Sequence, residues 1–305
     1  ASTFTIDSIK NWSGEGSNSA VMVIQWSDDQ SDNKAWAFGY HFDGTSTGAQ
    51  MLETIVKNNP QLYSITQTSG YGLVIGGLGW DTDGNGLRLT NGTDTIEANE
   101  YGQFSGSGYN FDNMKPVDAN DLWNSGWYSS YWSYWIGTSA SSLGYSGVGA
   151  TGRKVTDGCW DMWKISTATS DGKLVSAPSL IPDDAVRRFT IDGVCYELLT
   201  YSKGRKTVQM VKPFNGSTYK GTITVPAQFT YKDLTYDVVA VADSACYNAT
   251  GLTTLSLPGT ITKVGSYAFA HAGIATVNLE NVKSLGTGAF AGSSLTAVKL
   301  PTLVT

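Results

Sequence analysis

The sequence reads LTTLSLP at residues 252–258, IATVNL at 274–279 and LTAVKLP at 295–301, three phrases in which apolar residues alternate with small polar ones. Each phrase follows an alanine and a larger apolar residue, at Ala245-Cys246, Ala268-Phe269 and Ala289-Phe290, spaced 23 and 21 residues apart. A repeat unit of this length cannot bury its apolar face alone, so successive units stack. We therefore expect a stacked array of strands, in which Cys246 occupies the interior position that Phe269 and Phe290 fill.

These phrases resemble the BspA-type leucine-rich repeats of bacterial surface proteins. The preceding segments FTIDGVCY at 189–196, YKGTITVP at 219–226 and YDVVAV at 236–241 resemble the β-hairpin entry cap of such arrays. The resemblance covers residues 189–305 and implies a surface-exposed interaction scaffold rather than a chemistry. An array without a polar terminal repeat exposes apolar surface, so we expect a trimmed chain or further repeats.

The composition of the chain changes near residues 176–184, which read SAPSLIPDD. All 10 tryptophans lie between Trp12 and Trp163, and residues 1–182 carry 9 basic against 18 acidic residues. Residues 183–305 carry 11 basic against 8 acidic residues. We predict a mainly β fold with three parts: a β-rich (α+β) ligand-binding domain with one clear helix over 1–176, a linker over 177–184, and a BspA-like leucine-rich-repeat solenoid over 185–305.

Local patterns in the first domain predict its elements. The runs AVMVIQW at 20–26 and WAFGYHF at 36–42 favour strands, and residues 62–68 and 71–79 favour a hairpin. Thr47 and Gln50 form a capping box before an apolar helix face, and Pro60 ends that helix.

Overall composition excludes several function classes. A net charge of −6 argues against nucleic-acid binding, which requires a basic face. Three widely spaced cysteines predict neither a disulfide framework nor a zinc site, and we expect each to be buried. The two histidines, His41 and His271, accompany no nucleophile motif, so we predict a non-enzymatic protein. The many carboxylates of the first domain leave glycoside hydrolysis open, although nothing singles out a pair.

The loop DTDGNG at residues 81–86 places Asp81, Asp83 and Asn85 at the 1, 3, 5 spacing of calcium loops. Gly92 stands where an EF-hand needs a bidentate glutamate, which excludes a complete EF-hand. We favour an Asx-rich turn here. A calcium site completed by oxygen atoms from distant residues stays open, and no other cofactor is expected.

Residues 123–135 hold seven aromatic residues in thirteen positions and no aliphatic one. Because side chains of an extended chain alternate between two faces, one core cannot bury all seven rings. An amphipathic ring platform for a ligand is the hypothesis that we favour over scattered surface exposure. The predicted ligand-binding residues are Trp123, Trp127, Tyr128, Tyr131, Trp132, Trp135 and Tyr145, with the Gly-rich segment 144–152 as a lid. His41 as a ligand contact is left open.

Four further phrases, WAFGYHFDG at 36–44, residues 48–52, YWSYWIG at 131–137 and TDGCWDMW at 156–163, resemble exported domains of Bacteroidetes. Together with BspA-type repeats, such a domain resembles the surface lipoproteins that accompany vitamin B12 uptake systems. The resemblance implies a cobalamin (cobamide) ligand, a lipid anchor in the outer membrane and delivery to an outer-membrane transporter. It identifies no site residues. A glycan makes similar demands on aromatic rings, so a glycan-binding or adhesion protein is the alternative.

Overall fold

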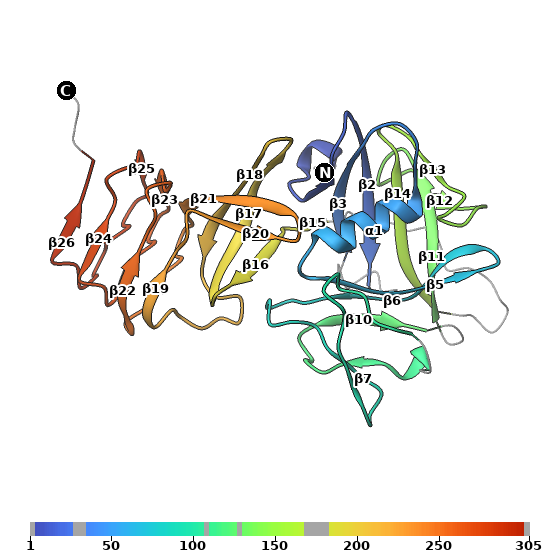
Figure 1. Cartoon of the computed structure of the whole chain (residues 1–305), viewed down its shortest axis with the longest axis horizontal. Helices are drawn as coiled ribbons and strands as arrows, with labels where there is room; N and C mark the ends of the chain where they lie inside the picture. Colours follow the sequence, from blue (N-terminus) through green and yellow to red (C-terminus); the bar gives the residue numbers. More distant parts are fainter. Residues whose placement is uncertain (1–3, 27–34, 107–109, 127–129, 168–182, 302–305) are drawn as a thin grey trace. The chain divides into compact units, whose positions relative to one another are not determined.

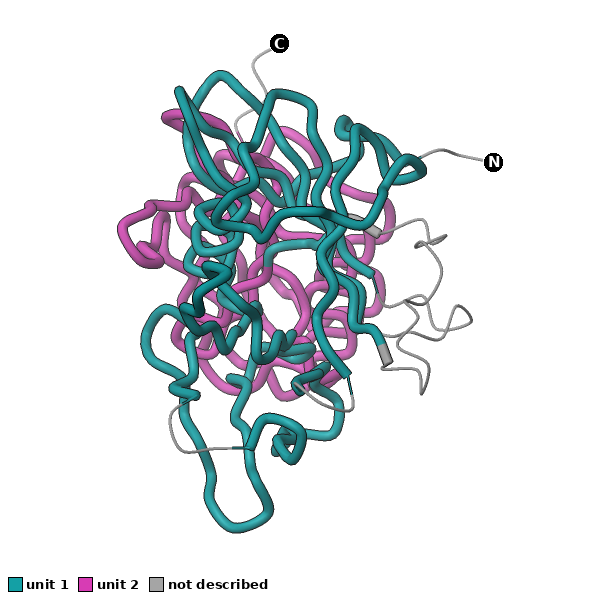
Figure 2. The backbone as a smooth tube through the Cα atoms, turned by 90° about the vertical axis from the view of Figure 1, so that its right-hand side faces the viewer, with its two compact units in different colours: residues 1–187 teal, residues 188–305 magenta. Residues whose placement is uncertain are grey.

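The computed structural model describes residues 4–26, 35–106, 110–126, 130–167 and 183–301. The chain forms two compact units, residues 1–187 and 188–305 (Figure 2). Strands dominate both units, and the described residues contain a single α-helix (Figure 1). The predicted mainly β fold class is therefore confirmed.

The boundary between the units lies later than the sequence indicates. Strand β15 (Asp183–Asp184) falls in the predicted linker, yet it pairs in parallel with Trp36 and Ala37 of the first unit. Arg187 is fully buried against first-unit residues, and its guanidinium donates to Ser13 and Asn11. These contacts extend the first unit to Arg187, while residues 177–182 of the predicted linker lie outside the described part of the chain.

The main sheet of the first unit has the strand order β1-β3-β2-β14-β11-β12, with β15 also on β3. Its strands are β1 (Trp12–Gly14), β2 (Asn18–Gln25), β3 (Ala35–Phe42), β11 (Ser130–Gly137), β12 (Gly144–Tyr145) and β14 (Trp160–Thr167). Strands β2 and β3 fall on the two runs predicted as strands, and they are antiparallel neighbours. The aromatic segment supplies β11, which pairs with β14 and β12.

A second sheet has the order β10-β6-β5, from β5 (Leu62–Ser69), β6 (Gly72–Trp80) and β10 (Leu122–Ser125). Its β5–β6 hairpin is the one that the sequence predicts. In the pairing of β6 with β10, Trp80 lies opposite Leu122, which brings the residues just beyond this pair together. Short strands complete the unit: β4 (Ser46–Thr47) with β13 (Lys154–Val155), and β7 (Leu89–Thr90) with β8 (Thr95–Ile96) and β9 (Lys115–Pro116). The 3₁₀ turns are η1 (Ile6–Ser8) and η2 (Phe111–Asn113).

Helix α1 (Gly48–Asn58) begins at the predicted capping box. The backbone N–H of Gln50 donates to Thr47 Oγ1, and the Gln50 side chain accepts from the backbone of Thr47. The helix buries the apolar face made by Met51, Leu52, Ile55 and Val56. This face joins a core cluster with side chains of β2, β3, β6, β11 and β14.

The second unit begins with a hairpin sheet and continues as stacked repeats. Its larger sheet has the order β16-β17-β18-β21-β23-β25, with β20 on β21. These strands are β16 (Arg188–Ile191), β17 (Val194–Ser202), β18 (Arg205–Val211), β20 (Gln228–Tyr231), β21 (Leu234–Val241), β23 (Lys263–Val264) and β25 (Ser284–Leu285). Two further two-stranded sheets are parallel pairs. They join β19 (Gly221–Thr224) with β22 (Leu252–Ser256), and β24 (Thr276–Asn278) with β26 (Ala297–Lys299).

Equivalent residues of successive repeats make equivalent contacts. The backbone N–H of Cys246 donates to Ala268, and that of Phe269 donates to Ala289. Two turn positions per repeat have a left-handed backbone, occupied by Ser244 and Asn248, then Tyr267 and His271, then Gly288 and Gly292. Cys246 and Phe269 are both buried, so the interior position predicted for Cys246 is confirmed. Among the described residues, no helix is long and apolar enough to cross a membrane.

Candidate functional site

A pocket of about 390 Å³ opens in the first unit, beside β11, the β5–β6 hairpin tip and the Gly-rich segment. Six aromatic residues contribute to its wall: Tyr71, Tyr131, Trp132, Tyr134, Tyr145 and Trp163. The remaining lining residues are aliphatic, serine or glycine, and none of the lining residues carries a charge. The pocket is therefore suited to a neutral ligand with apolar faces.

The rings of this pocket differ in their exposure. The side chain of Tyr71 is 91% exposed and that of Tyr145 is 49% exposed, so both stand at the mouth. Tyr131 is half-buried and shares a side-chain hydrogen bond with Tyr145. Burial, with Tyr145 close by, raises the pKa of Tyr131.

The inner wall of the pocket belongs to the core. Tyr134 of β11 lies opposite Trp163 of β14, and the two rings stack with centroids 4.3 Å apart. Trp132 is buried, meets Trp26 edge to face, and donates from its indole N–H to the Asn124 carbonyl. These contacts fix the rings before any ligand arrives.

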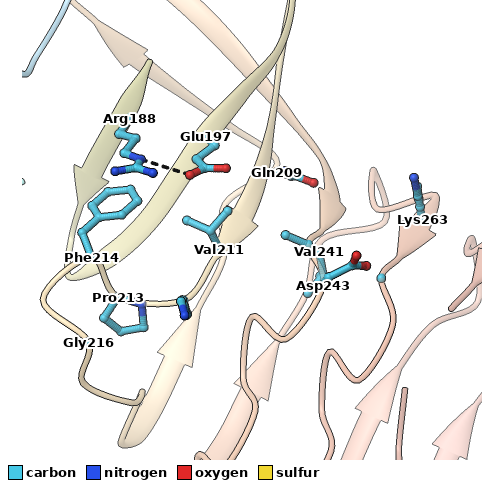
Figure 3. Close-up of a pocket in the computed structure, with 13 residues that line it drawn as sticks. Arg188, Glu197, Gln209, Val211, Pro213, Phe214, Gly216, Val241, Asp243 and Lys263 are labelled. Atoms are coloured by element: carbon cyan, nitrogen blue, oxygen red, sulfur yellow. Dashed lines mark hydrogen bonds and ion pairs between the residues drawn. The ribbon is translucent and has the colours of Figure 1, made fainter. Parts of the chain in front are cut away.

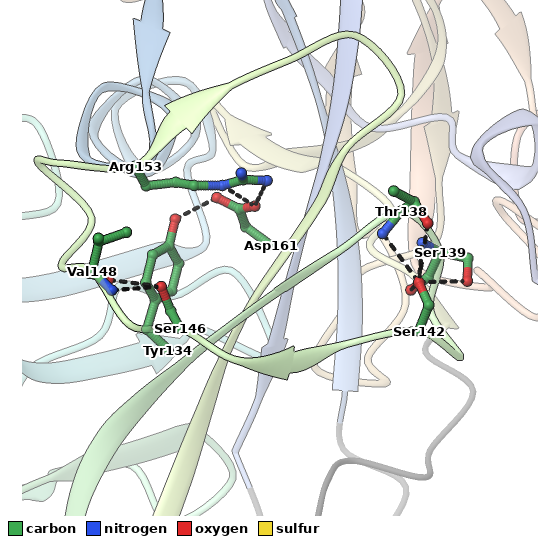
Figure 4. A network of polar contacts seen from close by, with 8 residues as sticks. All are labelled: Tyr134, Thr138, Ser139, Ser142, Ser146, Val148, Arg153 and Asp161. Atoms are coloured by element: carbon green, nitrogen blue, oxygen red, sulfur yellow. Dashed lines mark hydrogen bonds and ion pairs between the residues drawn. The ribbon is translucent and has the colours of Figure 1, made fainter.

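A buried polar network holds Tyr134 in place (Figure 4). Its hydroxyl donates to Asp161 Oδ2, while Arg153 Nε and Nη2 donate to Asp161 Oδ1 at 3.1 and 3.0 Å. Asp161 is completely buried. Desolvation raises the pKa of Asp161, and the hydrogen bonds from Tyr134 and Arg153 oppose that rise.

The Gly-rich segment 144–152 is tied to the core at several points. The backbone N–H of Ser146 donates to the Tyr134 carbonyl, and the Ala150 carbonyl accepts from Ala49 at the start of α1. Thr151 Oγ1 accepts from the backbone N–H of Leu73 at 2.9 Å. Residues 147–149 are exposed. The hypothesis that residues 144–152 act as a lid stays a prediction.

The other predicted ligand-binding rings lie elsewhere. Trp123 packs edge to face on Phe104 in a separate apolar cluster, and its indole N–H donates to Ser125 Oγ. Trp135 is buried in the cluster on the opposite side of the main sheet, although its ring meets Tyr145 edge to face. Trp127 and Tyr128 lie outside the described residues. The pocket thus brings together Tyr131, Trp132 and Tyr145 from the predicted set.

Sequence reasoning did not identify Tyr71, Tyr134 or Trp163 as pocket residues. Tyr71 stands in the hairpin turn, where an exposed aromatic residue is a signal that could have been read. Trp163 reaches the pocket only because β14 pairs with β11, which no local pattern indicates.

The imidazole ring of His41, on β3, contacts other side chains of the first unit. Its ring stacks on Trp12 with centroids 4.2 Å apart, and its Nδ1 is hydrogen-bonded to Ser19 Oγ. All three cysteines are free and buried, as expected from the sequence. Burial raises the pKa of the Cys246 thiol to about 12.

The second unit has a larger and more polar pocket of about 510 Å³ (Figure 3). Arg188 forms an ion pair with Glu197 at 3.0 Å and lies over the ring of Phe214. Lys263 and Asp243 also line this pocket. This charged lining, which also includes Lys212, is less suited to an apolar ligand than that of the aromatic pocket.

The acidic loop contributes no residue to the lining of the aromatic pocket. A carboxylate oxygen from each of Asp81, Asp83 and Asp121 lies within 4.8 Å of the other two. Asn85, the third predicted ligand, donates its side-chain N–H groups to Asp83 and Asp118, and its role as a ligand stays a prediction. Desolvation, with Asp81, Asp118 and Asp83 nearby, raises the pKa of Asp121 to about 7.

Comparisons with known proteins bear on the second unit. A family model described as a BspA type leucine rich repeat region matches residues 227–305, in six copies. The pneumococcal vaccine antigen PcpA is similar at 14% identity and a TM-score of 0.30, over 37% of this chain and 38% of that one. A leucine rich cell surface protein from Faecalibacterium prausnitzii A2-165 is similar at 14% identity and a TM-score of 0.17, over 40% of this chain and 57% of that one.

The chain therefore spans about two fifths to three fifths of these two structures. No curated protein matches it. The resemblance seen in the repeat phrases is confirmed for the C-terminal part, whereas nothing in these comparisons bears on vitamin B12 binding. The stacked strands and the family match together show that residues 227–305 form a BspA-type leucine-rich repeat region.

Proposed function

We propose that the protein is a bacterial cell-surface binding protein that captures a ligand in the aromatic pocket of its first unit. The observation that carries this proposal is the uncharged pocket lined by six rings, whose volume lies in the usual range for small-molecule sites. The BspA-type repeat region supports a role in adhesion or protein contact. The lining contains no carboxylate, histidine or cysteine, so the proposal assigns binding and no catalysis to the pocket.

The ligand that we propose first is a cobamide. A corrin ring is a broad disc with apolar faces and a rim of amides, and its cobalt is already coordinated. Such a molecule exceeds the pocket, so part of it would enter while the disc lies across Tyr71 and Tyr145 at the mouth. The exposed residue Gly147 also lines the pocket, and we propose that its backbone meets the amides. A lipid anchor in the outer membrane and delivery to a transporter complete this proposal.

A glycan is the second candidate, and the exposed rings at the mouth favour it. Tyr71 and Tyr145 present flat faces and hydroxyl groups without charge, which suits stacking on a sugar. On this alternative, the two units would both contribute to attachment at a surface.

Isothermal titration with cyanocobalamin, followed by a glycan array, tests both candidates. We expect Tyr145→Ala to weaken ligand binding by about 5- to 150-fold, because a ring that anchors a ligand is worth about 1–3 kcal/mol. Tyr101→Ala is the matched control, since Tyr101 is also partly exposed but does not line the pocket. Glycan binding without cobalamin binding would select the alternative. Binding that Tyr145→Ala and Tyr71→Ala leave unchanged would place the site elsewhere.

A further inference from the structure

Three aspartates from two distant parts of the sequence meet at one end of the second sheet. Asp81 follows β6 directly and Asp121 precedes β10 directly. Because Trp80 lies opposite Leu122 in this antiparallel pair, Asp81 and Asp121 are the next residues to face each other. Asp83 joins them, so that one oxygen of each carboxylate lies within 4.8 Å of the others. Like charges in such cross-strand positions destabilise a sheet.

Asp121 has a buried oxygen that nothing in the described residues satisfies. Its side chain is only 5% exposed, and its Oδ1 accepts from the backbone N–H of Thr82 at 3.0 Å. Its Oδ2 has no hydrogen-bond partner among the described residues. No described lysine or arginine forms an ion pair with Asp81, Asp83 or Asp121. A buried carboxylate oxygen without a partner is costly, so this arrangement calls for a positive charge.

We propose that Asp81, Asp83 and Asp121 bind one calcium ion. Two oxygen ligands at calcium distances of about 2.4 Å are at most about 4.8 Å apart, which the three carboxylates satisfy. The cluster offers oxygen donors only, whereas zinc sites draw on cysteine and histidine. Magnesium is bound through one or two carboxylates and keeps several waters, so three convergent carboxylates favour calcium.

The loop that follows β6, residues 81–86, orients the carboxylates of Asp81 and Asp83 before an ion binds. Asp81 Oδ1 accepts from the backbone N–H of Gly84 and Oδ2 accepts from that of Gly86, both at 2.8 Å. Asp83 is held by the backbone N–H of Asn85 at 3.1 Å. Each carboxylate oxygen has a second lone pair available for a cation. Asn85 helps to position Asp83 through its backbone and side-chain N–H groups, and Asp121 adds a carboxylate that the sequence motif did not contain. A direct contact of the Asn85 amide oxygen with the ion stays a prediction.

The cation would join the ends of β6 and β10. Strand β6 reaches from this site to the aromatic pocket, which Leu73, Val74 and Ile75 line at its other end. Bound calcium would thus stabilise the sheet that borders the pocket, without touching the ligand.

The experiment compares the wild-type chain with Asp121→Asn and Asp83→Asn. Each protein is treated with EDTA and dialysed. Calcium binding is then measured by titration with CaCl₂, and stability is measured by thermal unfolding at pH 7.5. For the wild type we expect one calcium ion per chain. At a hundredfold excess over the dissociation constant, the unfolding midpoint should rise by about 5–10 °C. Both variants should bind calcium at least about tenfold more weakly, because affinity follows the number of charged ligands. Glu53→Gln is the charge-matched control, since Glu53 is exposed on α1 outside the cluster.

In EDTA, Asp121→Asn should unfold at no lower temperature than the wild type, since it removes one of three crowded negative charges. Should it fail to fold, Asp83→Asn alters a half-buried member of the cluster and tests the same site. The proposal is overturned if the wild type binds no calcium at 10 mM CaCl₂, a ceiling well above the about 10⁻⁴–10⁻³ M typical of extracellular calcium modules. Unchanged calcium affinity in both variants, or tighter binding of MgCl₂ than of CaCl₂, would overturn it as well.

Discussion

Replacing Tyr134 by phenylalanine removes one hydroxyl from the network behind the aromatic pocket. That hydroxyl is the hydrogen-bond donor to Asp161 Oδ2, and Asp161 is completely buried. Arg153 continues to hold the other carboxylate oxygen, Oδ1, at 3.0 Å. A hydrogen bond to a charged group contributes about 1.5–3 kcal/mol, so we expect the free energy of unfolding to fall by about 2 kcal/mol. For a unit of this size, the unfolding midpoint would drop by about 4–8 °C.

Urea unfolding followed by tryptophan fluorescence measures this loss, and Tyr131→Phe is the matched control. Tyr131 stands on the same strand, but its hydroxyl meets the partly exposed side chain of Tyr145 rather than a buried carboxylate. The control should lose less than about 1 kcal/mol. The variants Tyr134→Phe, Asp161→Asn and their combination form a double-mutant cycle, for which we expect a coupling energy of about 1 kcal/mol or more. A loss below about 0.5 kcal/mol for Tyr134→Phe, which is the lower limit for an ordinary neutral hydrogen bond, together with zero coupling, would refute the network as a source of stability.

Three further outcomes follow from burial and packing. Trp132→Ala should lower the free energy of unfolding by about 3–5 kcal/mol in the same urea assay, because Trp132 is buried. Tyr145 is half-exposed, so Tyr145→Ala should lower this free energy by less than about 1 kcal/mol. Equal losses would contradict the burial of Trp132. Because burial raises the pKa of Cys246 to about 12, this thiol should react with a disulfide reagent at pH 8 only after denaturation, and rapid modification of the native chain would count against the buried position. Gly265→Ala would place a Cβ atom 2.4 Å from the backbone nitrogen of Asp243 in the preceding repeat, and it should lower the free energy of unfolding by about 1–3 kcal/mol. Gly251→Ala is the control, because its Cβ atom would meet the flexible side chain of Lys220, and it should change the midpoint of thermal unfolding little.

Elements that depend on neighbouring residues were predictable from the sequence. The capping box of Thr47 and Gln50 begins α1 where expected, since both partners lie within one helical turn. The repeat phrases predicted the stacked array, because each unit repeats the same small and large residues at the interior positions.

Features that join distant segments were not predictable. The antiparallel pairing of β14 with β11 places Trp163 against Tyr134, and no local pattern contains that pairing. Asp121 lies 40 positions beyond Asp81 in the sequence, and only the register of β10 against β6 brings the two together. The excess of rings in residues 123–135 indicated an unusual surface, but not which rings would face the core.

The matching hydrogen bonds of successive repeats have an evolutionary consequence. The backbone N–H of Cys246 donates to Ala268 just as that of Phe269 donates to Ala289, so each repeat presents to the next repeat the surface that it receives from the previous one. A gene duplication that inserts one whole repeat would leave every existing interface between repeats intact. Each inserted repeat would lengthen the array by about 4.8 Å, the spacing of neighbouring strands. The reach of such an array can therefore change in small steps, while the aromatic pocket of the first unit is inherited unaltered.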